Sequence, residues 1–418
     1  MDNELLSILN RRLTEADRSV AEALVGLAVR RGEQVYLVGG SVRDLLLGRA
    51  HVDLDIAVEG DAIALAGELA EVRQGRVIAH QAFGTASVEL ASARVDLAQA
   101  RAETYSRPGA LPAVRAASID EDLHRRDFTV NAMALRLTPP SAGQLLDPHG
   151  GKGDLERRFI RVLHDASFRD DATRMLRAVR YEVRLGFRLE DETDRLLCRD
   201  LSYLETISGA RLRAEIVAMF FEERTSETLA RCEELNILGA LHRCLRFDKT
   251  AESALARAQE ERPAPWDEVC LCLLCWHCDE RDIESVVRRL ALPRRYERAL
   301  LDSVRLRERL PELRQSDAPP SRIADLLDAL TPAAAWALAL RADDALAAER
   351  ARRFLSEWRY VKSSIGASAL RRLGVPAGPE LGILLRRLRA ARLDGLTHNR
   401  EDELSLLAQK QEWAQRED

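Results

Sequence analysis

The first 140 residues alternate between short apolar runs and segments with helical spacing. Aliphatic and β-branched residues dominate the runs 35–38, 52–58, 86–90 and 94–97, which we predict to be strands. The intervening segment 61–71 has the apolar spacing of a helix. Strands that alternate with helices are typical of an α/β domain, which we predict for the N-terminal end.

The rest of the chain has a helical pattern. There is no proline between residues 149 and 262, and apolar residues recur at three-to-four spacing at Met175, Leu176, Val179 and Val183. Prolines then punctuate further helical segments as far as a Gly/Pro cluster at 374–379. We therefore predict an α/β head followed by helical domains.

Composition narrows the class of protein. The chain has 418 residues, of which 46% are apolar and 31% charged, as in globular proteins with several domains. The longest uncharged apolar stretch, 269–278, is about half the length that crosses a bilayer, and no signal pattern opens the chain. Seven scattered cysteines do not predict a disulfide framework. We expect a cytoplasmic protein without a membrane partner, and the sequence leaves its oligomeric state open.

The net charge of −5 does not exclude a nucleic-acid partner. Only four of the 63 basic residues are lysines. Arginine grips phosphate and base edges with two parallel hydrogen bonds, so the places where arginines cluster matter more than the total charge.

A glycine turn follows the first expected strand, in Gly39, Gly40 and the nearby Arg43. A strand that runs through glycines into a helix lets backbone N–H groups approach phosphate, and Arg43 can add a forked cation. The alternative is a plain turn.

Two aspartates come next, Asp53 and Asp55, in the expected strand 52–58. Residues two apart on a strand share a face, so their carboxylates repel each other unless a cation lies between them. Carboxylate oxygens suit Mg²⁺ that is bound together with substrate phosphates, and Asp96 can join as a further ligand or base. The alternative is an aspartate that faces solvent at a strand end.

A third cluster joins Arg125, Arg126, Asp127 and Asn131 to an apolar run. The arginines can hold triphosphate oxygens, and Asp127 with Asn131 can bind ribose hydroxyls. The alternative is a charged helix cap.

A fourth cluster places Asp171, Arg174, Arg177 and Arg180 on one half of a helix surface, opposite the apolar residues. A carboxylate accepts and a guanidinium donates, which matches the amino group and ring nitrogen of cytosine and adenine but not the edges of uracil and guanine. Asp171 with Arg174 can therefore select CTP and ATP. The alternative is a solvated face held by ion pairs.

In this order and spacing, the clusters resemble the bacterial class II tRNA nucleotidyltransferases, which build or repair the CCA end of tRNA. The resemblance is dense to about residue 225 and sparse afterwards. The matching segments are LVGGSVRDLLLG, VDLDIAVEG, FGTASVEL, RVDLAQARAETYSRPGALPAV, DLHRRDFTVNAMAL, LLDPHGGKGDLERRFIRVLHDASFRDDATRMLRAVRYEVRLGF and, more loosely, LGVPAGPELGILLRRL with ARLDGLTHNREDEL.

The resemblance implies a polymerase-β-like nucleotidyltransferase head (1–140), followed by a helical neck that recognises the base (141–225) and by a body (226–330) and tail (331–418) that bind tRNA. It also implies transfer of nucleotides from CTP or ATP to the tRNA 3′ end with release of pyrophosphate. The sequence does not distinguish CC, A and full CCA addition. A poly(A) polymerase and a catalytically silent RNA-binding protein are the alternatives.

The implied roles fall on the residues already singled out. Gly40 and Arg43 hold the triphosphate, Arg126 and Asp127 bind phosphate and ribose, and Asp53 with Asp55 bind Mg²⁺. Two segments depart from the family pattern, with Asp170 where glutamate is common and 365–370 where relatives often have Gly-Asp-Leu.

One further group suggests a metal site at first sight, namely Cys270, Cys272, Cys275, Cys278 and His277. The spacing is helical and the stretch is apolar, so we interpret these cysteines as small core residues.

Overall fold

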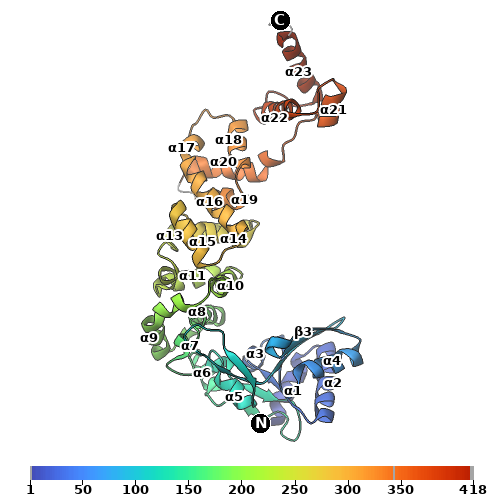
Figure 1. Ribbon diagram of the computed structural model, residues 1–418, viewed down its shortest axis with the longest axis vertical. Coiled ribbons are helices and arrows are strands. Elements are labelled where there is room, and N and C mark those ends of the chain that lie inside the picture. The colour runs from blue at the N-terminus through green and yellow to red at the C-terminus, as the bar shows by residue number, and fades with distance from the viewer. Residues whose placement is uncertain (1, 342–343, 415–418) are drawn as a thin grey trace. The chain divides into compact units, whose positions relative to one another are not determined.

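The computed structural model describes residues 2–341 and 344–414 (Figure 1). The chain forms two compact units, Met1–Ala240 and Leu241–Asp418, which we call the N-terminal and C-terminal units. The predicted fold class, an α/β head followed by all-helical parts, is confirmed. The finer division into head, neck, body and tail stays a prediction.

A seven-stranded sheet forms the centre of the N-terminal unit. Its strands are β1 (Gln34–Val38), β2 (Leu54–Glu59), β3 (Arg76–His80), β4 (Thr85–Glu89), β5 (Arg94–Gln99), β8 (Ala134–Arg136) and β9 (Leu145–Leu146). They are ordered β3-β4-β5-β2-β1-β8-β9. Neighbours β2 and β5 are parallel, and their register sets Asp55 beside Asp96. The four predicted strands correspond to β1, β2, β4 and β5.

Helices α2 (Glu15–Arg31) and α4 (Ala62–Arg73) pack against each other and against this sheet. The α4 helix begins after Asp61, whose carboxylate accepts hydrogen bonds from the backbone N–H groups of Ile63 and Ala64 at 3.1 and 3.0 Å. Its fully buried Leu65 and Leu69 lie on the side that meets the strands. The carboxylate-bearing strands are therefore held by a well-packed core.

The N-terminal unit and its boundary with the C-terminal unit contain further helices. They are α1 (Asp2–Arg12), α3 (Gly40–Leu46), α5 (Ile119–His124), α6 (Gly151–Arg157), α7 (Ser167–Asp170), α8 (Thr173–Leu185), α9 (Asp191–Asp200), α10 (Gly209–Phe220), α11 (Thr225–Glu234) and α12 (Ile237–Leu241), with short 3₁₀ helices η1 (Gln81–Phe83), η2 (Thr129–Asn131) and η3 (Leu201–Thr206). In α8, Met175, Leu176 and Val179 are buried, as their spacing predicts.

Two small sheets complete the N-terminal unit. Strands β6 (Arg101–Thr104) and β7 (Ala113–Ala116) form an antiparallel pair, and β10 (Phe159–Ile160) pairs in parallel with β11 (Arg188–Leu189). The β10–β11 pair interrupts the region 149–262 that we predicted as helical. Strands of two residues are too short to show alternation, so the sequence pattern did not reveal them.

The C-terminal unit is helical. Its elements are α13 (Lys249–Glu261), α14 (Trp266–Leu274), α15 (Glu280–Arg289), α16 (Arg294–Glu308), α17 (Leu310–Leu313), α18 (Pro320–Asp328), α19 (Pro332–Leu340), α20 (Ala345–Ser356), η4 (Trp358–Tyr360), α21 (Ala367–Arg372), α22 (Pro379–Leu393) and α23 (Arg400–Ala414). Cys270, Cys272, Cys275 and Cys278 are buried in its core as free thiols. Across the described residues, we find no helix with the length and apolar character needed to span a membrane.

Candidate active site

Three carboxylates lie where the adjacent central strands β2 and β5 begin, along the strand-end border of the large sheet that we call the sheet edge. Asp55 lies on β2, Asp53 precedes this strand, and Asp96 is the register partner of Asp55 on β5. Asp55 accepts a hydrogen bond from the Ser41 hydroxyl at 3.3 Å, and Asp96 pairs with Arg94 at 3.2 Å. Asp55 and Asp96 line a cavity of about 390 Å³.

Two arginines line this cavity, Arg94 and Arg126, and they pair with Asp96 and Asp122. Burial raises the pKa of Asp55, and the charges of Asp96 and Asp53 raise it further, against the opposing effects of Ser41 and Arg126. Among the described residues, neither Asp53 nor Asp55 forms an ion pair with a basic side chain. Carboxylate oxygens suit a hard divalent cation, so Asp53 and Asp55 have the chemistry to hold one, but the described residues contain no cluster of three or more metal-ligating side chains.

The predicted glycine turn borders the same cavity. Gly39 has φ +64°, and a Cβ atom on it would lie 2.5 Å from Nη1 of Arg126. Only glycine tolerates both this conformation and this contact. The turn thus allows the Arg126 guanidinium to lie against the backbone of the first strand–helix junction.

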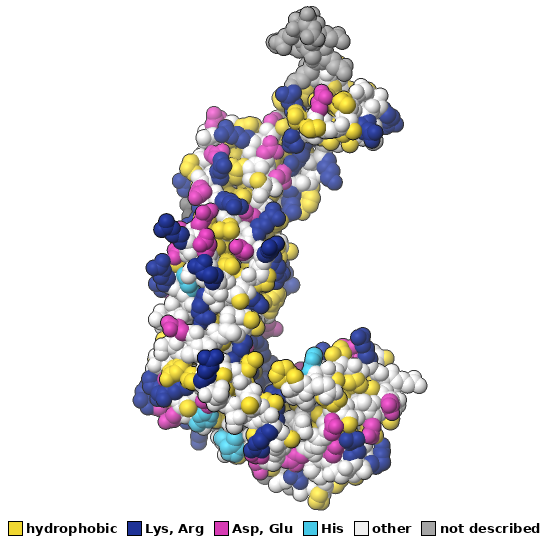
Figure 2. All heavy atoms as spheres, in the orientation of Figure 1, with side chains coloured by type: hydrophobic (Ala, Val, Ile, Leu, Met, Phe, Trp, Pro, Cys, Tyr) yellow, Lys and Arg dark blue, Asp and Glu magenta, His cyan; other side chains and the backbone are white. Residues whose placement is uncertain are grey.

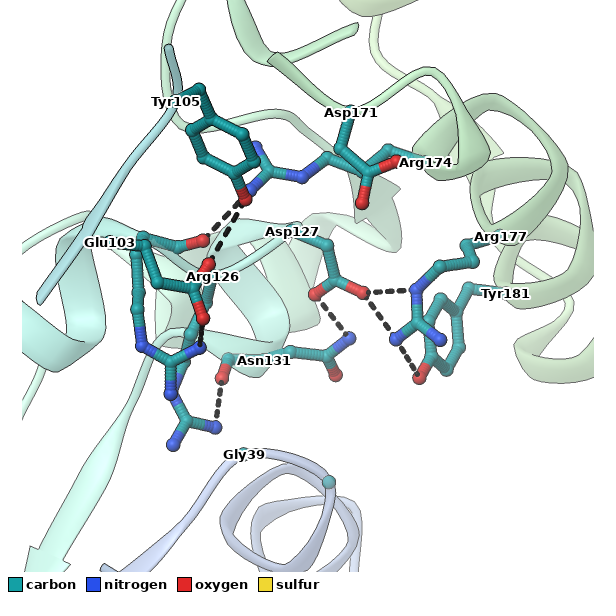
Figure 3. Close-up of a pocket in the computed structure, with 12 residues that line it drawn as sticks. Gly39, Glu103, Tyr105, Arg126, Asp127, Asn131, Asp171, Arg174, Arg177 and Tyr181 are labelled. Atoms are coloured by element: carbon teal, nitrogen blue, oxygen red, sulfur yellow. Dashed lines mark hydrogen bonds and ion pairs between the residues drawn. The ribbon is translucent and has the colours of Figure 1, made fainter. Parts of the chain in front are cut away.

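A second cavity, of about 320 Å³, shares Gly39, Gly40 and Arg126 with the first (Figure 3). It lies wholly within the N-terminal unit. Its lining is completed by Glu103, Tyr105, Arg125, Asp127, Asn131, Asp171, Arg174, Arg177 and Tyr181. We call it the arginine-lined cavity.

Asp122 holds the first two arginines of this cavity in place. Its two oxygens accept hydrogen bonds from Arg125 at 2.6 Å and from Arg126 at 2.9 Å, and the residue is 1% exposed. Burial alone would raise the pKa of Asp122, but the adjacent Arg126 and Arg125 hold it below its ordinary value. Arg125 also pairs with Glu103 at 2.8 Å.

Asp127 and Asn131 form a hydrogen-bonded chain along the cavity wall. Asp127 accepts from the Asn131 amide at 3.1 Å and from Arg177 at 2.6 Å (Figure 3). Burial opposes ionisation of Asp127, yet Arg177 keeps the pKa of this carboxyl below its ordinary value. The side-chain amide oxygen of Asn131 in turn accepts from Arg43 at 2.7 Å.

Arg43 lies behind this wall and does not belong to the cavity lining. It is 5% exposed, and its Nε and Nη2 donate to the two carboxylate oxygens of Asp44 at 2.9 and 3.0 Å. Its guanidinium thus bonds to Asp44 and to the Asn131 side chain in this structure. A role for Arg43 in holding the triphosphate stays a prediction.

Asp171 and Arg174 lie at the other end of the arginine-lined cavity, but they do not pair with each other. One oxygen of Asp171 accepts from the backbone and hydroxyl of Thr173 at 3.0 and 2.7 Å, and the other accepts from Arg211 at 2.6 Å. Arg174 donates through Nη2 to the carbonyl of Arg125 at 2.8 Å. Its Nη1 is buried and has no hydrogen-bond partner among the described residues.

Arg177 and Arg180 take different positions on α8. Arg177 lines the cavity, whereas Arg180 lies outside the lining and pairs with Glu215 at 2.7 Å and Glu222 at 3.0 Å. A role for Arg180 in nucleotide binding stays a prediction.

Family models match two segments of the chain. Residues 35–161 match the "Poly A polymerase head domain", and residues 186–246 match the "Probable RNA and SrmB- binding site of polymerase A". Similarity to a solved structure of a CCA-adding enzyme in its apo form II covers 97% of this chain and 98% of that one, with 30% identity and a TM-score of 0.84. The chain belongs to the bacterial class II tRNA nucleotidyltransferases.

Other members of this family are similar over different lengths. The A-adding tRNA nucleotidyltransferase of Geobacter sulfurreducens is 31% identical over 96% of this chain but only 48% of its own length, so the chain spans about half of that relative. The CC-adding enzyme of Deinococcus radiodurans is 45% identical over 36% of this chain and 41% of its own. A Thermotoga maritima CCA-adding enzyme complexed with tRNA is 29% identical, with a TM-score of 0.77 and coverage of 97% and 98%.

Sequence reasoning about this chain missed four residues of the site. Glu103, Tyr105 and Tyr181 line the arginine-lined cavity, and Arg211 pairs with Asp171. Glu103 and Tyr105 lie in a segment that carried the family resemblance. Had residues 101–104 been predicted as a strand, alternation would have placed Glu103 on the same face as Arg101. No local signal pointed to Arg211, which lies 40 positions from its partner.

Proposed function

We propose that this protein transfers nucleotides from CTP or ATP to the 3′ end of tRNA. The observation that carries the proposal is the pair of adjoining cavities, joined at Gly39, Gly40 and Arg126. One is lined by Asp55, which forms no ion pair with any described residue, together with Asp96, and the other is lined by arginines. In the reaction, the 3′ hydroxyl of the tRNA attacks the α-phosphorus, a new phosphodiester bond forms, and the bond to pyrophosphate breaks. The names of the relatives above refer to tRNA, so nothing in them favours general poly(A) polymerase activity.

The far end of the arginine-lined cavity supports selection of the base. Nη1 of Arg174, which is buried and has no acceptor among the described residues, would donate to a ring nitrogen, and Asp171 retains lone pairs that would accept from an exocyclic amino group. Cytosine and adenine offer this pair of groups, whereas uracil and guanine offer the opposite order. The chain itself would serve as the template.

The remaining groups of this cavity suit the sugar and phosphates. Arg125 and Arg126 would bind phosphate oxygens, with the Gly39–Gly40 turn allowing close approach of the backbone. Asp127 and Asn131 would bind ribose hydroxyls.

Asp53 and Asp55 would hold Mg²⁺, with Asp96 nearby as a further ligand or as a base. When bound, the ion would lower the pKa of the attacking hydroxyl and stabilise charge on the leaving group. The protein's own part is to keep the carboxylates at the sheet edge, close to the turn that receives the triphosphate.

The helical parts would have two tasks. Residues 141–225 would form the neck that recognises the base, and residues 226–330 and 331–418 would form the body and tail that bind tRNA. Lys and Arg side chains occur along the visible face of the C-terminal unit, mixed with acidic ones (Figure 2). Because these cations would contact RNA phosphates, affinity for tRNA should fall steeply as salt rises.

The experiment is incorporation of labelled CTP and ATP, separately and together with Mg²⁺, into tRNA that ends at the discriminator base, at C or at CC, and into an unrelated RNA. ATP accepted only on the CC end indicates an A-adding enzyme, CTP alone on the shorter ends a CC-adding one, and both in order a CCA-adding one. Equal use of the unrelated RNA would indicate a poly(A) polymerase. No incorporation, or a D53A/D55A double variant as active as the parent, would refute the proposal.

A further inference from the structure

Tyr181 is a residue of the arginine-lined cavity to which nothing above assigns a function. It lies on α8 one turn beyond Arg177 and faces the cavity beside it (Figure 3). Arg174, at the base-selecting end, is two turns earlier on the same helix. Because α8 rises about 1.5 Å per residue, Tyr181 lies roughly 10 Å along the helix from Arg174.

The ring of Tyr181 is surrounded by cations. The guanidinium carbons of Arg43, Arg177 and Arg184 lie 5.3, 5.5 and 5.7 Å from its centroid. Phe128 meets the ring edge-on at 5.8 Å. These contacts fix the ring, since each cation is attracted to the electron-rich faces of an aromatic system.

The hydroxyl of Tyr181 has an unused donor. Arg177 Nη2 lies 3.3 Å from it and, because a guanidinium only donates, the tyrosine oxygen acts as the acceptor. Among the described residues, no group accepts the hydroxyl hydrogen. The charge of Arg177 itself is largely committed to Asp127, with which it forms two hydrogen bonds at 3.0 and 2.6 Å.

The surroundings indicate which part of a nucleotide this donor meets. Arg43, which contacts the ring, lies within 3.4 Å of the position that a Cβ atom on Gly40 would take. Tyr181 is therefore linked to the glycine turn, at the end of the cavity opposite Asp171 and Arg174. A nucleotide whose base meets Arg174 would direct its phosphates toward this end.

Building on the proposed function, we propose that the Tyr181 hydroxyl donates a hydrogen bond to a β- or γ-phosphate oxygen of the incoming nucleotide. The residue would thereby distinguish nucleoside triphosphates from monophosphates, and its ring would keep Arg43 and Arg177 in position. Because the contact is made to phosphate, it would act alike on CTP and ATP.

The test compares Y181F with the parent protein, since phenylalanine keeps the ring and removes only the hydroxyl. The dissociation constants of ATP and AMP are measured by calorimetry, and the KM and kcat for CTP and ATP by incorporation into tRNA. We expect the ATP dissociation constant and both KM values to rise about tenfold, with AMP affinity and kcat within a factor of two of the parent. Y203F is the matched control, because Tyr203 also lies under a guanidinium, that of Arg169 at 5.8 Å, but does not line the cavity.

Two results would overturn the inference. Unchanged ATP affinity would show that the hydroxyl does not contact the phosphates, and equal losses for ATP and AMP would place its contact on the nucleoside. A parent protein that binds ATP but incorporates nothing into tRNA would refute the proposed function, while the ATP–AMP comparison would still decide the role of Tyr181.

Discussion

The carboxylates at the sheet edge and those at the arginine-lined cavity differ in how the protein neutralises their negative charge. Asp122 and Asp127 each pair with arginines of the protein, which hold the pKa of both groups below the ordinary value despite burial. Asp55 has no such partner, and its pKa is raised by burial and by Asp96 and Asp53. The first kind of acid stabilises the fold and positions arginines, whereas the second is held in an unfavourable environment that an external cation would relieve.

The largest expected effect is a loss of activity, without a loss of stability, when Asp55 at the sheet edge is substituted. Asp55→Asn should lower the rate of nucleotide incorporation by about a hundredfold to a thousandfold, because it removes a charge expected at the reacting phosphate. Single-turnover incorporation into tRNA measures this loss. Glu192→Gln, in an exposed ion pair with Arg195, is the matched control and should act like the parent. A D55N variant with parental rates would remove Asp55 from the reaction.

At Asp122 we expect the main effect of a substitution to be a loss of stability. Asp122→Asn should lower the free energy of unfolding by about 3 kcal/mol, because two partly buried guanidiniums lose their shared counter-ion. Denaturant titration followed by circular dichroism measures the change. A loss under about 0.5 kcal/mol, the range of an ordinary surface substitution, would show that Asp122 does not stabilise the cavity wall.

Asp171 lies between these two cases, because a single arginine from another helix, Arg211 on α10, neutralises its charge. Arg211→Gln should raise the KM for CTP and ATP about tenfold and narrow the discrimination against UTP and GTP, since the Asp171 carboxylate would lose the bond that fixes its orientation. Steady-state kinetics with all four nucleotides measure both effects. If the melting temperature fell while discrimination stayed unchanged, Arg211 would have only a structural role.

The smallest effect is a pH dependence. The folded-state pKa of Asp122 is lowered, so its contribution to stability is complete above the unfolded pKa, about 3.9, and is lost as pH falls through the folded value. The difference in unfolding free energy between the parent and D122N should therefore be constant from pH 7 to about pH 4.5 and shrink below it. If this difference grew as the pH fell, the folded-state pKa of Asp122 would be raised and not lowered.

Much of the site was predictable because its chemistry is local in sequence. The glycine turn at Gly39, the strand that carries Asp55 and the apolar face of α8 each depend on residues a few positions apart, and periodicity reveals them. The order of the clusters identified the family before any contact was known.

The pairing within the cavity was not predictable from such patterns. Arg211 meets Asp171 across 40 positions and Arg177 meets Asp127 across 50, so only the folded chain brings them together. Arg43 illustrates the same limit. Its motif indicates a phosphate ligand, which stays a prediction, but no pattern showed that the adjacent Asp44 and the distant Asn131 accept its hydrogen bonds.

The measurement that tests the central contrast most directly is thermal unfolding of the parent and D55N, each with excess chelator and with Mg²⁺. Without metal, D55N should be at least as stable as the parent, because it removes a half-buried charge that has no ion-pair partner in the described part of the chain. Mg²⁺ should raise the melting temperature of the parent but not that of D55N. Equal stabilisation of both proteins by Mg²⁺, or a D55N variant less stable than the parent in chelator, would contradict the account of the sheet-edge carboxylates.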